Sequence, residues 1–371
     1  MKSAYTQDIQ TFQELEREYL RQDSKAKSRV GYLCLRVPPE YIQACRAVPL
    51  RIVPLSGYDP SGRKALTSHK TLTGFTDIRT DACSFCRSVP AILQTESYHN
   101  LNAIIGGACC DQMRRLMDTL QKDLDIPVIL FGAPRTWNAD RGYFRAEMHN
   151  ALCRIAEISG HVPTQYELWD RIRINNKLKL IVNRLRHQGK LSNSLLQKIA
   201  SSPLPPEKVI EHLKGFENRH PITAEIKLML AGSIPGTWEL EVIEGNGARV
   251  TADVTCQGDR VFHDPVVENG DPLAQLYETY VENNLCPHRR PVTPLIEYMR
   301  ELAAQRHVDG VIYRSVKYCH PWGLLAERMR NELGLPILIV DDDLTSPAVE
   351  SFRTRVGAFI EMLKMKLKKT A

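Results

Sequence analysis

Residues 103–131 read AIIGGACCDQMRRLMDTLQKDLDIPVILF, and this stretch decides the fold that the sequence predicts. Residues 103–106 and 126–131 are short apolar runs, which are typical of buried strands. Between them, Leu116 and Leu120 have the four-residue spacing that places two side chains on one face of a helix. A strand, a helix and a second strand in succession predict a βαβ unit with parallel strands.

A second α/β region is predicted in the C-terminal part of the chain. Its predicted strands are the apolar runs at residues 227–231, 249–254, 309–313 and 336–340. Helices are predicted at residues 322–334, which end at a glycine, and at residues 352–369. Between the two α/β regions, residues 143–213 contain no convincing strand and predict helices that break at residues 160–163 and 201–206.

We therefore predict an α/β fold with two Rossmann-like or flavodoxin-like parallel-sheet lobes and a helical segment between them. The expected division of the chain is an N-terminal helix at residues 1–30, a first α/β lobe at 31–142, a helical segment at 143–222 and a second α/β lobe at 223–371. The length of 371 residues fits two or three domains.

The composition is that of a globular protein, with 43% hydrophobic and 25% charged residues. No apolar run approaches the ~20 residues that a membrane-spanning helix needs. The N-terminal residues are polar and acidic and lack the apolar centre of a secretory signal. We therefore expect a cytoplasmic protein with no membrane partner.

The net charge of +6 is unevenly distributed. Eight basic residues and no acidic residue lie between Arg171 and Pro206, so the rest of the chain carries a formal charge of −2. We interpret this basic segment as an amphipathic helix with a solvated face, with an anion-binding or acidic-partner surface as the alternative. Because no aromatic residue alternates with the basic ones, the segment does not favour nucleic-acid binding.

Clustered cysteines point to a metal centre. The reducing cytosol disfavours disulfides, so clustered thiols there indicate metal binding or catalysis. Cys110 and Cys319 each follow a predicted strand and precede a predicted helix, which is the edge where open α/β sheets bind ligands. Because they come from different lobes, they could hold a metal between the lobes. Four other cysteines are expected to be buried apolar residues, namely Cys34, Cys45, Cys153 and Cys256.

Cys83 and Cys86 form a C-x-x-C motif, which occurs in zinc sites, redox dithiols and iron–sulfur sites. The adjacent pair Cys109–Cys110 does not repeat this spacing, as a structural zinc site would usually require. The motif therefore favours iron–sulfur over zinc, although a chance spacing remains an alternative for the pair taken alone.

The order and spacing of several motifs give a family resemblance over nearly the whole chain. The motifs are CSFCRSV (83–89), CCDQMRRLMDTLQKDLDIPVILFGAPR (109–135), LMLAGSIPG (228–236), NNLCPHRRP (283–291), VDGVIYRSVKYCHPWG (308–323) and FRTRVGAFIEML (352–363). Together they resemble the 2-hydroxyacyl-CoA dehydratase family, of the 2-hydroxyglutaryl-CoA dehydratase D-component type. This family also contains the subunits of ATP-dependent benzoyl-CoA reductases.

The resemblance implies a 4Fe–4S cluster in the cleft between the lobes, held by one cysteine from each of three motifs. The matching positions are Cys83, Cys110 and Cys319. Additional candidates are Cys86, Cys109 and Cys286, and Cys86 could replace its neighbour as a ligand. These extra thiols keep an alternative open, because some relatives hold a double-cubane 8Fe–9S cluster with more cysteines and reduce small molecules as homodimers.

The resemblance also implies the reaction. Such proteins are iron–sulfur subunits of anaerobic enzymes that pass one low-potential electron to an acyl-CoA thioester, forming a ketyl radical. The outcome is a dehydratase (lyase) or a benzoyl-CoA reductase-type oxidoreductase. The sequence G-x-x-x-x-G-K-[ST] is absent, so ATP is expected to act only through a separate iron–sulfur activator. The expected partners are this activator, the acyl-CoA substrate and a homologous second subunit in a heterodimer or larger assembly. A non-catalytic electron-relay subunit remains an alternative.

Acid–base chemistry has one weak candidate in the sequence. His320 follows Cys319 directly and could act as a catalytic residue, although a structural histidine at a helix start fits the position equally well. Glu40, in the motif VPPE, is expected to be an acid on the surface of a helix.

Overall fold

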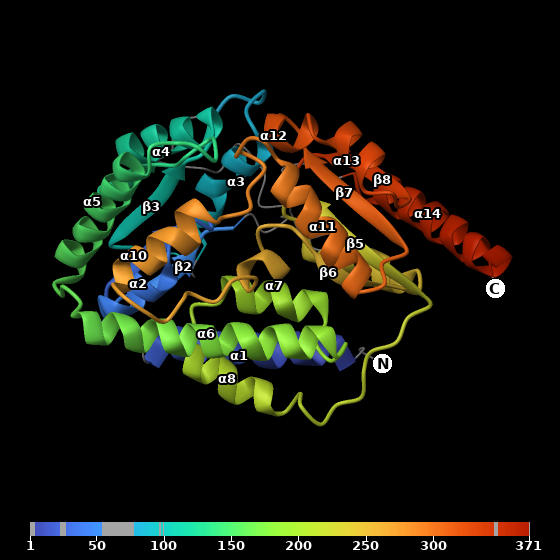
Figure 1. Ribbon diagram of the computed structural model, residues 1–371, viewed down its shortest axis with the longest axis horizontal. Helices are drawn as coiled ribbons and strands as arrows, with labels where there is room; N and C mark the ends of the chain where they lie inside the picture. The colour runs from blue at the N-terminus through green and yellow to red at the C-terminus, as the bar shows by residue number, and fades with distance from the viewer. Residues whose placement is uncertain are drawn as a thin grey trace.

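The computed structural model describes residues 4–22, 27–53, 78–95, 98, 100–344 and 348–370. Among these residues the chain forms two four-stranded parallel sheets flanked by helices, as Figure 1 shows. The first sheet contains β1 (Arg29–Tyr32), β2 (Val48–Arg51), β3 (Ala103–Ala108) and β4 (Val128–Gly132). The second contains β5 (Ile226–Gly232), β6 (Ala248–Asp253), β7 (Gly310–Val316) and β8 (Ile337–Asp342). The predicted α/β fold with two parallel sheets is therefore confirmed.

Both sheets have the same strand order, β2-β1-β3-β4 in the first and β6-β5-β7-β8 in the second. In each sheet the second strand in the chain lies on one side of the first strand, and the third strand lies on the other side. The carboxyl ends of β1 and β3, and those of β5 and β7, are therefore the switch points at which open α/β sheets bind ligands.

In addition to α1 (Ala4–Gln22), thirteen α-helices of the described residues surround the sheets. In the first half they are α2 (Pro39–Ala44), α3 (Ser84–Leu93), α4 (Asp111–Asp123), α5 (Arg141–Ser159), α6 (Gln165–His187), α7 (Asn193–Ser201) and α8 (Pro206–Lys214). In the second half they are α9 (Thr237–Gly245), α10 (Pro272–Tyr277), α11 (Thr293–Gln305), α12 (His320–Gly323), α13 (Ala326–Glu332) and α14 (Val349–Thr370).

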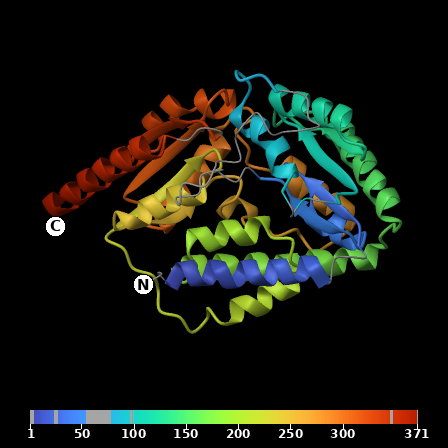
Figure 2. The ribbon, with the colours of Figure 1, turned by 180° about the vertical axis from the view of Figure 1, so that it is seen from behind.

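Helices α1, α6, α7 and α8 form a layer beneath both sheets, which Figures 1 and 2 show from opposite sides. Phe12 of α1 and Leu195 of α7 are fully buried in one apolar cluster that extends to the first sheet. The second sheet is covered on one face by α11, α12 and α13 and on the other by α9 and α14. Burial on both faces explains why the strands are continuous apolar runs.

The helix boundaries follow from local sequence. α5 ends at Gly160, which has a φ of 72°, a conformation that glycine adopts without strain. α6 begins at a capping box, in which the Thr164 hydroxyl accepts from the Glu167 amide and the Glu167 carboxylate accepts from the Thr164 amide. These features confirm the predicted break at residues 160–163.

Several sequence expectations differ from the structure. The helix expected at residues 1–30 ends at Gln22 as α1, and Arg29 and Val30 belong to β1. The basic segment, expected to be one amphipathic helix, is divided between α6 and α7, which are separated at residues 188–192.

The predicted helix at residues 322–334 is two helices, α12 and α13. The strands β1 and β2 were not predicted, because they have four residues each and contain Gly31 and Pro49, which weaken a strand pattern. Residues 1–3 and 23–26 of the predicted helix at 1–30 lie outside the described residues. No helix of the described residues is long and apolar enough to cross a membrane.

Candidate metal centre

The carboxyl ends of the two sheets border one cavity. Its lining includes Cys34 after β1 and Cys110 after β3 from the first sheet, and Ile234 after β5 and Cys319 after β7 from the second. The cavity holds about 860 Å³ of empty space, with open solvent at its mouth included. Eight of the ten cysteines line it: Cys34, Cys83, Cys86, Cys109, Cys110, Cys256, Cys286 and Cys319. The structure thus brings together all six predicted ligand candidates.

Backbone contacts hold the three cysteine motifs beside one another. The amide of Cys83, at the start of α3, donates to the side-chain oxygen of Gln112 in α4 at 3.2 Å. The next amide, of Ser84, donates to the Lys317 carbonyl after β7, also at 3.2 Å. Cys110 is the N-cap of α4, and its sulfur accepts from the Met113 amide at 3.4 Å. The start of α3 is therefore tied to the edges of both sheets.

One group of thiols consists of Cys83, Cys86 and Cys319. Hydrogen bonds from Cys319 and then Cys86 lower the pKa of Cys83 to about 3, despite its burial. The same hydrogen bonds, together with burial, raise the pKa of the Cys319 and Cys86 thiols. The group therefore holds one thiolate shared among three sulfur atoms, which is a soft, anionic donor set.

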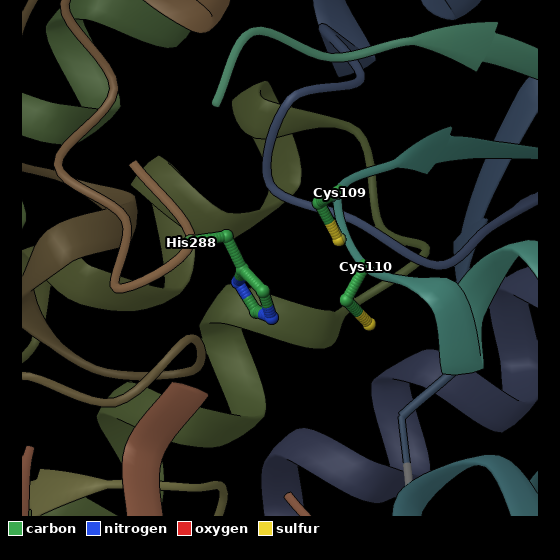
Figure 3. Close-up of side chains that lie close together, drawn as sticks. All are labelled: Cys109, Cys110 and His288. Atoms are coloured by element: carbon green, nitrogen blue, oxygen red, sulfur yellow. The ribbon is translucent and has the colours of Figure 1, made fainter. Parts of the chain in front are cut away.

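A second group surrounds His288 and is partly shown in Figure 3. The ligand atoms of Cys109, Cys110 and His288 lie within 4.8 Å of one another. The sulfur of Cys286 lies 3.2 Å from Nδ1 of His288. A hydrogen bond from Cys109 is the main cause that lowers the pKa of Cys110 to about 4. A hydrogen bond with Cys109 is also the main cause that lowers the pKa of Cys34 to about 7.

His288 carries the positive charge of this group. Burial opposes its protonation, but the Cys286 and Cys110 thiolates raise the pKa of His288 to about 10. Burial likewise opposes ionisation of Cys286, yet the charge of His288 lowers the pKa of that thiol to about 5. The partly buried His288 imidazole and the Cys286 and Cys110 thiols therefore favour one another's charged forms.

The donor chemistry fits an iron–sulfur group. Iron–sulfur clusters are held by cysteine thiolates, and this cavity presents eight sulfur atoms with two acidified groups. The group of Cys109, Cys110 and His288 also has the sulfur and nitrogen donors that zinc takes.

Two expected acid–base residues are placed differently. His320 is exposed and is not among the residues that line the cavity. Glu40 was expected on the surface of a helix, but it is completely buried. Its carboxylate accepts from the Tyr280 hydroxyl at 2.7 Å and lies 3.6 Å from the Lys179 ammonium.

The basic segment between Arg171 and Pro206 is mostly paired within the chain. Six of its eight basic side chains lie within 4.0 Å of a carboxylate from outside the segment: Arg171–Glu207, Arg173–Glu268, Lys179–Glu40, Arg184–Glu217, Arg186–Asp259 and Lys198–Glu16. Arg186 and Lys179 are buried, whereas Arg173, Lys177 and Arg184 are exposed, so the expected solvated basic face holds for only part of the segment.

Sequence reasoning missed Cys34, Cys256 and His288 as residues of the cavity. Cys34 follows β1, the strand that was not predicted, so its place at a sheet edge could not be inferred. His288 stands two residues after Cys286, and this Cys-x-His spacing was the available signal.

Comparisons with known proteins agree with the motifs. The sequence matches the family described as 2-hydroxyglutaryl-CoA dehydratase, D-component, over residues 34–363. It is 23% identical to a protein named dehydratase subunit YjiM of Escherichia coli K12, covering 90% of this chain and 91% of that protein. It is 20% identical to the (R)-phenyllactyl-CoA dehydratase beta subunit of Clostridium sporogenes, covering 76% of this chain and 80% of that subunit.

Among solved structures, the chain resembles the solute-binding protein FpvC of Pseudomonas aeruginosa with bound Ni²⁺. The identity is 10%, the coverage is 93% of this chain and 98% of that chain, and the TM-score is 0.20. This score is too low to bear on fold or function.

Proposed function

The chain belongs to the 2-hydroxyglutaryl-CoA dehydratase D-component family, as its motifs predicted, and we propose that it is the iron–sulfur subunit of an ATP-activated 2-hydroxyacyl-CoA dehydratase. Family membership makes it a component of a dehydratase-type enzyme. The observation that carries the finer proposal is that Cys83, Cys110 and Cys319 meet at one cavity between the carboxyl ends of two sheets.

Cys83, Cys110 and Cys319 would hold a 4Fe–4S cluster through their sulfur atoms. When bound, such a cluster supplies a single low-potential electron for the acyl-CoA thioester. The protein's own residues favour ionisation of Cys83 and Cys110 and line the site with apolar surface. His288 holds a positive charge beside Cys110, and Phe85, Ile234 and Trp322 contribute apolar surface to the cavity.

The proposed enzyme needs partners. The relative from Clostridium sporogenes is named a beta subunit, which supports a homologous second subunit for this chain as well. An ATP-hydrolysing iron–sulfur activator would deliver the electron, because the chain has no P-loop sequence. The substrate of the assembly would be an acyl-CoA.

A second candidate function is favoured by the extra thiols. Cys34, Cys109 and Cys286 form a second sulfur group around His288, separate from the group of Cys83, Cys86 and Cys319. Two sulfur groups at one cavity support a double-cubane cluster in a homodimeric reductase of small molecules.

The iron content decides between the two candidates. The chain is purified anaerobically, and its iron, sulfide and co-purifying subunits are measured. About four iron atoms per chain support the dehydratase subunit, and about eight support the double cubane. A colourless protein with stoichiometric zinc would contradict both.

Activity is tested by anaerobic reconstitution with a strong reductant and an acyl-CoA, omitting each component in turn. Turnover is expected only when the activator, ATP and the second subunit are all present. Full activity without ATP would refute the proposed activation. Activity with the activator but without a second subunit favours the homodimeric candidate. Unchanged activity without this chain's cluster would assign it the role of a supporting or electron-relay subunit.

A further inference from the structure

Arg51 and Arg260 are two cationic side chains without an acidic partner among the described residues. No carboxylate of those residues lies within 4.0 Å of either guanidinium, whereas two other buried arginines each have one. Arg186 lies 3.1 Å from Asp259, and Arg314 lies 2.5 Å from Glu239. Arg36, also buried, likewise donates to backbone carbonyls, those of Val281 and Pro134. What distinguishes Arg51 and Arg260 is that both line the cysteine cavity.

Among the described residues, the two guanidiniums donate to neutral acceptors only. Arg51 donates to the carbonyl of Ala200 at 3.4 Å and to that of Cys256. Arg260 donates to the carbonyls of Val254, at 3.4 Å, and Leu285, and lies 3.7 Å from the sulfur of Cys256. The two positive charges therefore converge on Cys256, and the Nε atom of each is buried without a hydrogen-bond partner.

Burying a guanidinium without a counter-charge is unfavourable by several kcal/mol in order of magnitude. Arg51 is only 3% exposed, so water cannot solvate its charge effectively. No acidic residue of the described chain lines the cysteine cavity. The Cys286 thiolate faces Arg260 across the cavity. An anionic group bound beside Arg51 and Arg260 would supply the further counter-charge that no described carboxylate provides.

Arg51 and Arg260 also open onto a neighbouring pocket. With Leu35 and Asn284, they line both the cysteine cavity and a pocket of about 630 Å³, open solvent included. The one carboxylate among the described residues lining that pocket belongs to Asp264, which lies 2.6 Å from His263. Lys179, on the same wall, pairs with Glu40. The pocket thus keeps, at its border with the cysteines, two positive charges that no described carboxylate compensates.

We propose that Arg51 and Arg260 form an oxyanion subsite that binds the carboxylate of a small organic acid or acyl group beside the cysteine cavity. A guanidinium matches the planar shape of a carboxylate and can donate two parallel hydrogen bonds to it. The near-complete burial of Arg51 suits a small terminal group. The inference deepens the proposed function, because only that function makes the bound acid a substrate. Binding of the acid itself needs no cluster.

The test is calorimetric titration of the anaerobically purified chain with glutarate and, separately, with pyrophosphate. Glutarate represents an acyl carboxylate, whereas pyrophosphate represents the phosphates of coenzyme A. We expect glutarate to bind, with affinity reduced at least about tenfold in Arg260→Met and in Arg51→Met and partly retained in Arg260→Lys. The matched control is Arg330→Met, which removes an exposed arginine that pairs with Glu327 and should leave binding unchanged.

Several outcomes would overturn the inference. One is the absence of glutarate binding, and another is equal binding by the wild type and Arg260→Met. Tighter binding of pyrophosphate than of glutarate would overturn the carboxylate assignment. If Arg260→Met shifted the reduction potential of the metal centre but left glutarate binding unchanged, the two arginines would be assigned to the metal centre instead. Because Arg260→Lys keeps the charge, it separates loss of the anion site from loss of the fold. If the anaerobically purified chain contained no iron but still bound glutarate, the binding would support the subsite and the missing iron would contradict the proposed function.

Discussion

The two sheets share a strand order but carry opposite chemistry at their carboxyl ends. In the first sheet, Cys34 follows β1 and Cys109 and Cys110 follow β3, so the edge is rich in ionisable sulfur. In the second sheet, a buried ion pair occupies the corresponding edge. Arg314 in β7 lies 2.5 Å from Glu239 and donates to the carbonyl of Ile234 at 3.0 Å.

The second edge is also more tightly built. At the end of β5, Gly232 has a φ of 100°, and an added Cβ would lie 1.9 Å from the Arg314 carbonyl oxygen, so only glycine fits. The comparison teaches that strand order supplies the place for a site, whereas the side chains after each strand decide its use. The first edge presents most of the cavity thiols, whereas the second combines Cys319 with an ion pair that fixes the loop carrying Ile234.

The largest effect is expected from removing a sulfur atom from either edge. Cys110→Ala and Cys319→Ala should each reduce the iron content of the anaerobically purified chain to near zero, because each removes one proposed ligand. Iron and sulfide analysis measures this. Cys153→Ala is the control, since Cys153 lies in α5 away from the cavity lining. Full iron content and activity in either of the first two variants would show that the ligand set is wrong.

Breaking the ion pair of the second edge should affect stability rather than ligands. Arg314→Met leaves Glu239 buried without its partner, and we expect a loss of about 3–5 kcal/mol in the free energy of unfolding. Chemical denaturation of the apo-protein measures this. The control Arg330→Met removes an exposed ion pair and should cost at most about 1 kcal/mol. A similar loss in both variants would mean that the second edge is not fixed by its ion pair.

The stability loss in Arg314→Met should depend on pH. Burial raises the pKa of Glu239 above its usual 4.5, and Arg314 opposes this shift in the wild type. Without Arg314 the protonated carboxyl is favoured more strongly in the folded state. The variant therefore loses stability as the pH rises above the unfolded pKa, by up to about 1.4 kcal/mol per pH unit. Denaturation at about pH 5 and pH 8 should give the larger deficit at the higher pH, and the reverse order would contradict the assignment to Glu239.

The smallest effect is expected in the helical layer beneath both sheets. Arg184→Ala removes an exposed pair with Glu217, so the free energy of unfolding should change by about 0–1 kcal/mol. Because most charges of the basic segment are paired within the chain, activator affinity should stay within about twofold. Binding of the activator at several salt concentrations measures this. A tenfold loss would restore a docking role for the segment.

Much of the fold was predictable because six of the eight strands are apolar runs that periodicity detects. β1 and β2 were not, since Gly31 and Pro49 interrupt them, and with β1 the sheet-edge position of Cys34 was lost. Motif order brought six cysteines into one hypothesis. The burial of Glu40 and the pairing of the basic segment depend on partners 33 or more residues away in the chain, which no local pattern reports.

The repeated strand order has a consequence for symmetry. β2-β1-β3-β4 and β6-β5-β7-β8 make each half of the chain the structural counterpart of the other, so the molecule has the layout of a dimer of half-length chains joined into one. In a dimer of identical halves, each substitution occurs twice and both edges must serve the same purpose. Within a single chain the two halves can change independently, so most of the cavity thiols come from the first half and the ion pair of Arg314 and Glu239 comes from the second.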